Sequence, residues 1–118
     1  MKRLSILAAL VFFVAFTSFT SAQIQSGSWS TSVGDPNYNL NTNSGDRSMT
    51  IEVAYDKPFD VKPKVMLSVT QLDGDKASNQ RYNVEVLSVS RDGFTIKIRT
   101  WADSKIYSIS GYWLAYTE

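Results

Sequence analysis

Apolar and polar residues alternate along most of the chain after its first 22 residues. In the segment SMTIEVAY, for example, Met49, Ile51 and Val53 fall on one face of an extended backbone. This period of two is typical of a β-strand that buries one face and exposes the other. No segment repeats with the period of an α-helix, and turn residues recur about every ten positions, so we predict an all-β fold, a six-stranded antiparallel β-sandwich. The predicted strands are 23–30, 48–55, 64–72, 81–90, 94–98 and 106–114.

The segments between these strands are rich in turn residues. Residues 31–46 hold many Asn, Gly, Ser and Asp residues, which predicts a long loop of the kind that is functional or mobile. Residues 73–79 predict a turn. Asp73 and Asp75 in this turn resemble the start of a calcium loop, but the further oxygen ligands of an EF-hand are absent.

Some local features refine the strands. Residues 64–72 are apolar on both faces, as in a strand that is covered on both sides. The apolar phase of the next strand shifts near Leu87, which predicts a β-bulge. Gly93 closes the following turn, where we expect a positive φ. The last two strands flank a short polar segment at 102–105, and this arrangement predicts a β-hairpin.

The first 22 residues have a different composition. Lys2 and Arg3 precede an uncharged apolar run at 7–16, and small residues follow up to Ala22. This order is typical of a secretory signal peptide, whereas an uncleaved membrane anchor needs a longer apolar run. We therefore expect a signal peptide at 1–22, one domain at 23–118, secretion to the extracellular space and no membrane insertion.

The chain after Ala22 is almost neutral. The whole sequence has twelve basic and eleven acidic residues, and loss of Lys2 and Arg3 changes the formal net charge from +1 to −1. A surface with so little net charge does not attract DNA, RNA or anionic lipid. We exclude nucleic acid and lipid as primary partners.

Histidine and cysteine are both absent. Their absence excludes a serine triad, a Cys–His dyad and a zinc site with histidine ligands. An enzyme would have to use paired carboxylates, as glycosidases do, but most acidic residues here lie beside turn residues, where Asp is common for backbone reasons. We expect a binding protein, not an enzyme, with no cofactor and no metal.

The aromatic residues indicate a class of ligand. Of three Trp, six Tyr and six Phe, Trp101 and Tyr107 fall near the ends of strands. A ring can cover the C–H face of a pyranose, while arginine donates hydrogen bonds to its hydroxyls and aspartate accepts them. Arg81, Trp101, Tyr107 and a loop carboxylate such as Asp46 would suffice for a sugar. From the pattern alone, the rings could equally cover the open end of the sandwich, and Arg81 could be an ordinary solvated residue.

Seven short segments carry a resemblance to a known family. They are QSG at 25–27, PF at 58–59, KPKVMLSVTQLD at 62–73, NQR at 79–81, SVSRDGF at 88–94, TWADSKIYSIS at 100–110 and WLA at 113–115. In this order and spacing the chain resembles the H-type lectin domain, the family of the snail agglutinins and of the C-terminal domain of discoidin. The resemblance implies a parallel homotrimer that binds N-acetylgalactosamine or galactose in clefts between protomers.

The resemblance also implies roles for individual residues. Arg81 matches the arginine that hydrogen-bonds sugar hydroxyls, and Trp101 and Tyr107 match residues that line the sugar. The family uses an aspartate of the N-terminal loop, for which Asp46, preceded by Gly45, is the best candidate.

Two departures from the family pattern change the expectation. Ala102 stands where some relatives have histidine, so a donor near the sugar is lost and a strict preference for N-acetylgalactosamine is not expected. The absence of cysteine rules out the disulfide-linked double trimers of some relatives.

The predicted function is thus that of a secreted lectin for terminal N-acetylgalactosamine or galactose on cell-surface glycans, acting in adhesion, agglutination or innate defence. The first alternative is a secreted module that binds protein through the same fold. The second is a carboxylate-based glycan hydrolase.

Overall fold

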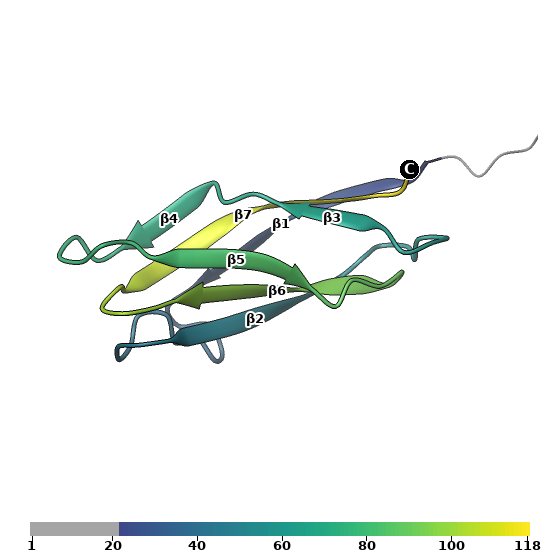
Figure 1. The fold of residues 1–118 in the computed structure, drawn as a ribbon. Coiled ribbons are helices and arrows are strands. Elements are labelled where there is room, and N and C mark those ends of the chain that lie inside the picture. Colours follow the sequence, from purple (N-terminus) through teal and green to yellow (C-terminus); the bar gives the residue numbers. More distant parts are fainter. Residues whose placement is uncertain (1–21) are drawn as a thin grey trace, which may run out of the picture.

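The computed structural model describes residues 22–118 and folds them into seven β-strands (Figure 1). The predicted signal peptide lies outside the described residues except for Ala22. Within 22–118, no helix is long and apolar enough to cross a membrane. The strands are β1 (Ile24–Ser32), β2 (Arg47–Ala54), β3 (Lys64–Leu67), β4 (Gln71–Gly74), β5 (Tyr82–Leu87), β6 (Gly93–Thr100) and β7 (Ile106–Tyr116).

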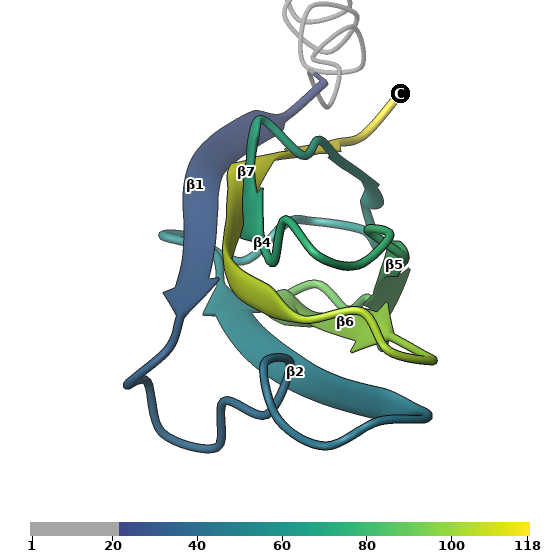
Figure 2. The ribbon, with the colours of Figure 1, turned by 90° about the vertical axis from the view of Figure 1, so that its left-hand side faces the viewer.

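The strands form two antiparallel sheets. In the first, β7 is central, with β1 along one side and β3 and β4 in succession along the other. The second sheet has the order β2-β6-β5. Figure 2 shows the two sheets as separate layers. The predicted antiparallel β-sandwich is confirmed.

The number of strands is seven instead of six, because the predicted strand at 64–72 is divided. Its parts, β3 and β4, pair with successive stretches of β7. Between them the carbonyl oxygen of Ser68 comes so close to Gly111 that a Cβ there would lie 1.8 Å from it. Both short strands alternate between exposed and half-buried residues, so the expectation of a strand covered on both faces is wrong.

The predicted hairpin between the last two strands is also wrong. β6 belongs to the three-stranded sheet and β7 to the four-stranded sheet, so residues 101–105 cross from one layer to the other. A hairpin and a crossover between layers both need two alternating strands and a short polar link. The alternation therefore predicted the strands correctly but not their pairing.

Two smaller predictions fail for local reasons. β5 pairs with β6 in unbroken register, and the strand simply ends at Leu87, where Ser88 takes a φ of 55°. The register shift of the fold lies instead between Asp73 and Gly74. Gly93 does not have a positive φ; a Cβ there would lie 2.2 Å from the backbone oxygen of the facing β2 strand.

Aromatic rings fill one end of the space between the layers. Tyr55 meets Phe59 edge-on with ring centroids 4.8 Å apart, and Phe94 meets Trp113 edge-on at 5.5 Å. Such edge-to-face contacts add to the stabilisation that burial provides. These rings lie near the start of β6, at one end of the sandwich.

At the opposite end the core is aliphatic. Ile98 of β6 and Ile106 of β7 are fully buried, and so is Leu40 from the long loop between β1 and β2. The backbone N–H of Ile106 donates to the carbonyl of Leu40 at 2.9 Å. The long loop is therefore packed into the core at the end of the molecule where β6 stops.

Candidate functional site

The register of the three-stranded sheet brings three predicted site residues to one end of it. The first residues of β2 and β5 both pair with Thr100, the last residue of β6. Asp46 precedes β2, Arg81 precedes β5 and Trp101 follows β6. Because β6 is the middle strand, Trp101 lies between the other two, just beyond the end of the sheet.

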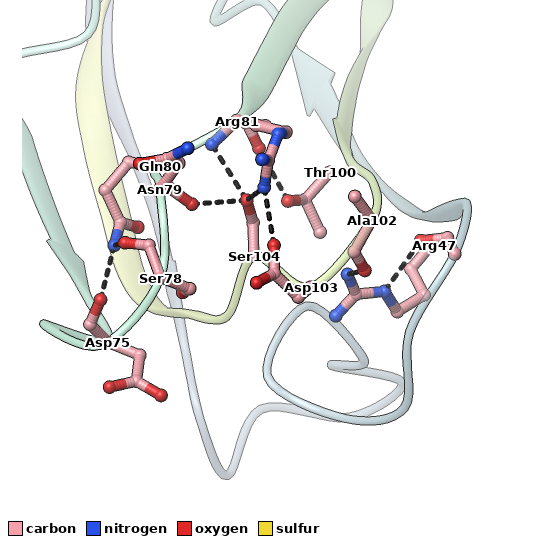
Figure 3. Close-up of polar contacts among 11 residues, drawn as sticks. Arg47, Asp75, Ser78, Asn79, Gln80, Arg81, Thr100, Ala102, Asp103 and Ser104 are labelled. Atoms are coloured by element: carbon pink, nitrogen blue, oxygen red, sulfur yellow. Dashed lines mark hydrogen bonds and ion pairs between the residues drawn. The ribbon is translucent and has the colours of Figure 1, made fainter.

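The Arg81 guanidinium is held by the turn that follows Trp101 (Figure 3). Its Nη1 donates to Oδ1 of Asp103 at 2.6 Å and to Oγ of Ser104 at 3.2 Å. Oγ of Ser104, a fully buried residue, also accepts the backbone N–H of Arg81 at 3.1 Å and donates to the carbonyl of Asn79. Arg81 is thus fixed in direction, and within residues 22–118 its Nε and Nη2 have no hydrogen-bond partner.

Trp101 is half-buried, and Arg99 covers one face of its ring. The Cζ atom of Arg99 lies 4.8 Å from the ring centroid, which is a cation–π contact. The same guanidinium donates from Nη2 and Nε to Oδ1 of Asp46 at 2.7 and 3.2 Å. Arg99 therefore connects the ring to the loop carboxylate within one chain.

Gly45 and Ala102 join the loop to the turn. The carbonyl of Ala102 accepts the backbone N–H of Gly45 at 2.9 Å. Both residues have a positive φ, 86° for Gly45 and 56° for Ala102. The loop that carries Asp46 is thereby tied to the turn that carries Trp101.

A buried arginine strengthens this tie. The side chain of Arg47 donates to the carbonyls of Leu40 at 3.4 Å, Thr42 at 2.9 Å, Gly45 at 3.0 Å and Ala102 at 3.0 Å. Arg47 is 8% exposed, so these bonds are largely shielded from water. We call Arg47 and its four carbonyls the loop clamp.

Tyr38 anchors the same loop to the start of β7. Its hydroxyl donates to the carbonyl of Ile106. Burial, with smaller contributions from Asp35 and Asp73, raises the pKa of Tyr38 to about 12. The hydrogen bond to Ile106 fixes the loop, which was expected to be functional or mobile, at this point.

Tyr107 is the one predicted site residue that these contacts do not include. It follows Ile106 in β7, its side chain is exposed, and its backbone carbonyl accepts the N–H of Val33 at 2.9 Å. Among the described residues, no hydrogen bond joins its hydroxyl to Arg81, Trp101 or Asp46. The structure therefore brings five of the six predicted residues together and places Tyr107 in the other sheet.

Three residues that contact the side chain of Arg81 or Trp101 were not foreseen from the sequence: Arg99, Asp103 and Ser104. A signal for Arg99 was available, because residues two apart in a strand share a face, and Arg99 stands two positions before Trp101. For Asp103 and Ser104 the only signal was their place in the turn after Trp101.

The site has balanced charge and does not offer a metal centre. Each arginine beside Trp101 has one carboxylate partner: Arg81 has Asp103, and Arg99 has Asp46. In the described part of the chain, no three His, Cys, Asp or Glu residues come together as a metal site would require. Elsewhere, Oδ1 of Asp75 accepts the N–H of Ala77 at 3.0 Å, as in an ordinary turn. This arrangement can donate hydrogen bonds to a neutral polar ligand and accept them from it.

The chain matches one protein family and is similar to several known proteins. A family model described as the H-type lectin domain matches residues 50–116, more than half of the chain. The matched range includes four of the six predicted site residues and leaves out Gly45 and Asp46. One of the discoidin-1 polypeptides of Dictyostelium discoideum is 35% identical over 77 residues, which are 64% of this chain and 30% of that protein.

Two further similarities concern more distant proteins. A Fuscovulum blasticum protein named "ATP synthase subunits region ORF 7" is 30% identical over 74 residues, 63% of this chain and 64% of that protein. The structure of wild-type discoidin II from Dictyostelium discoideum has the same fold, with a TM-score of 0.73 at 22% identity over 86% of this chain and 38% of that chain. The chain thus spans less than two thirds of the length of each of these relatives.

Proposed function

The chain belongs to the H-type lectin domain family, a family of carbohydrate-binding domains, and on that premise we propose that it is a secreted lectin for terminal galactose or N-acetylgalactosamine on cell-surface glycans. One observation supports this most directly: Asp46, Trp101 and Arg81 lie in a row beyond the end of the β2-β6-β5 sheet. A ring with a donor on one side and an acceptor on the other provides the parts that a pyranose needs.

The contacts of the site suit a hydroxyl-rich ligand. Arg81 is oriented by Asp103 and Ser104, so little side-chain freedom is lost when its remaining N–H groups meet a sugar. Asp46 engages Arg99 through Oδ1 alone, and in the described residues its Oδ2 has no partner. The free oxygen can accept a hydrogen bond from a sugar hydroxyl.

Ala102 bears on which of the two sugars is preferred. Its methyl group can neither donate nor accept a hydrogen bond, so the site has no side-chain donor at this position. We therefore propose that galactose and N-acetylgalactosamine are bound with similar affinity.

A single shallow monosaccharide site is weak, with a Kd on the order of 1 mM. Several sites on one assembly raise the effective concentration of each for a glycan surface. For this reason the proposed lectin acts as a homotrimer, with adhesion, agglutination or innate defence as its use.

The proposal predicts that Trp101→Ala and Arg81→Ala each abolish retention on a galactose matrix. Trp101→Ala removes the ring, and Arg81→Ala removes the fixed donor, while both residues lie outside the core. Retention is measured by affinity chromatography, and circular dichroism checks that each variant is folded. Lys97→Ala, on the outer face of the same strand, serves as control and should be retained. Full retention of both site variants would remove the assigned site.

A second candidate function is supported by the outer face of the four-stranded sheet. Met66, Tyr112 and Leu114 are exposed there, next to a hollow of about 570 Å³. Exposed apolar patches often mark protein contacts, so a secreted module that binds a protein is the alternative. A specific protein recovered by pull-down, together with no binding to any glycan, would favour it.

A further inference from the structure

Arg99 is positioned beside the proposed sugar site by the alternation of β6. Phe94, Ile96 and Ile98 point into the core, so Lys97 and Arg99 lie on the outer face of the sheet. The Cζ atom of Arg99 is 4.8 Å from the centroid of the Trp101 ring. A guanidinium at this distance occupies the space that a stacked pyranose would need on the same face. A sugar is thus limited to the other face or the edge of the ring.

Two ion pairs flank the ring, and in both the carboxylate is more exposed than the guanidinium. The side chains of Arg99 and Asp46 are 40% and 73% exposed, and those of Arg81 and Asp103 are 30% and 70% exposed. An approaching ligand therefore meets carboxylate oxygens first, and each arginine is already partly neutralised by its partner. Such a rim accepts hydrogen bonds from neutral hydroxyls and repels a second carboxylate.

We propose that Arg99 is a specificity-determining residue of this site: paired with Asp46 across one face of Trp101, it moderates a preference for neutral sugars over sugars that carry a carboxylate, and the exposed carboxylates create that preference. The inference rests on the proposed lectin function and adds a ligand class to it. Asp46 acts here by masking the charge of Arg99. Removal of Asp46 unmasks a cation, and removal of Arg99 unmasks an anion.

The experiment compares two ligands that differ in charge at one carbon, methyl β-galactoside and its uronic acid counterpart. Affinities are measured by NMR titration of the chain from residue 23, at pH 7 and low salt. We expect Asp46→Asn to raise the affinity for the uronic acid relative to the galactoside by about fivefold. We expect Arg99→Ala to lower the same ratio by about threefold. Both changes are small because the charges are exposed to solvent. Lys97→Ala and Glu85→Gln make the same changes in net charge on the outer face of the sheet and serve as matched controls.

The outcomes separate this inference from the proposed function. Opposite shifts in the two site variants, each larger than in its control, support the role of Arg99. Equal shifts in the site and control variants would show that only the net charge of the protein matters, and this would overturn the inference. Galactose binding by the unmodified protein would still support the proposed lectin function. If the unmodified protein binds neither ligand, the proposed function fails and the role of Arg99 fails with it.

Discussion

Ala102 has a left-handed backbone, which residues with a side chain rarely adopt. Its φ of 56° directs its carbonyl toward the N–H of Gly45 and the side chain of Arg47. For a residue other than glycine this conformation costs about 1 kcal/mol or more. The two hydrogen bonds that the Ala102 carbonyl accepts, from Gly45 and Arg47, offset this cost and hold the loop against the turn. Local backbone strain therefore lies inside the proposed site.

Ala102→Gly should therefore stabilise the domain, by roughly 0.5 kcal/mol after allowing for the greater freedom of glycine in the unfolded chain. Urea unfolding measures the change in the free energy of unfolding. Ala115→Gly, near the end of β7 and fully buried, is the control and should destabilise the domain. A destabilised Ala102→Gly variant would show that the positive φ is not strained.

Some residues of the site are predictable from their type, and others are not. Trp101 and Arg81 attract attention because a ring and an arginine beside strand ends are parts of a sugar site. Arg99 and Asp103 look like any surface charge in the sequence. Their roles depend on which oppositely charged side chain lies within 3 Å, and that follows only from the pairing of strands distant in the chain.

The long loop between β1 and β2 is the element that depends most on a single side chain. In the loop clamp, the side chain of Arg47 donates hydrogen bonds to three carbonyls of the loop and to one carbonyl of the turn after Trp101. A planar guanidinium can donate in several fixed directions at once, which lysine cannot do. The clamp thus holds Asp46 beside the ring.

We expect Arg47→Met to lower the free energy of unfolding by about 3 kcal/mol, because shielded carbonyls lose a charged donor. Urea denaturation measures the loss. Arg91→Met is the matched control, since exposed Arg91 makes one such bond, to the carbonyl of Phe59 at 2.8 Å, and should cost less than about 1 kcal/mol. Equal effects of the two substitutions would contradict the clamp.

At the scale of elements, the alternation of residues predicted where strands lie but not how they pair. Strands β2, β6 and β7 lie close to the positions predicted for them, which are 48–55, 94–98 and 106–114. The supposed hairpin is a crossover between sheets, because alternation is the same whichever sheet a strand joins. The break within 64–72 depends on the approach of Ser68 to Gly111, a contact between distant residues that no local pattern contains.

The whole molecule has two unlike outer faces. On the four-stranded sheet, Met66 and Leu114 stand opposite each other in the register, with Tyr112 exposed two positions before Leu114. On the three-stranded sheet, the outer face is polar and leads to Trp101. Exposed apolar surface on a domain without disulfides is the kind of surface that subunit contacts cover.

The proposed trimer predicts a mass three times that of the chain from residue 23. Multi-angle light scattering at micromolar concentration measures this mass directly. Association is expected because it buries apolar surface and gathers several weak sites in one assembly. A monomer mass under these conditions would contradict the trimer.

A glycan array probed with the chain from residue 23, beside its Trp101→Ala variant, tests the proposed lectin function most directly. We predict binding to glycans that end in galactose or N-acetylgalactosamine, weak or no binding to glycans capped by acidic sugars, and loss of the signal in the variant. Binding to no glycan, or equal binding by the variant, would contradict the proposed function.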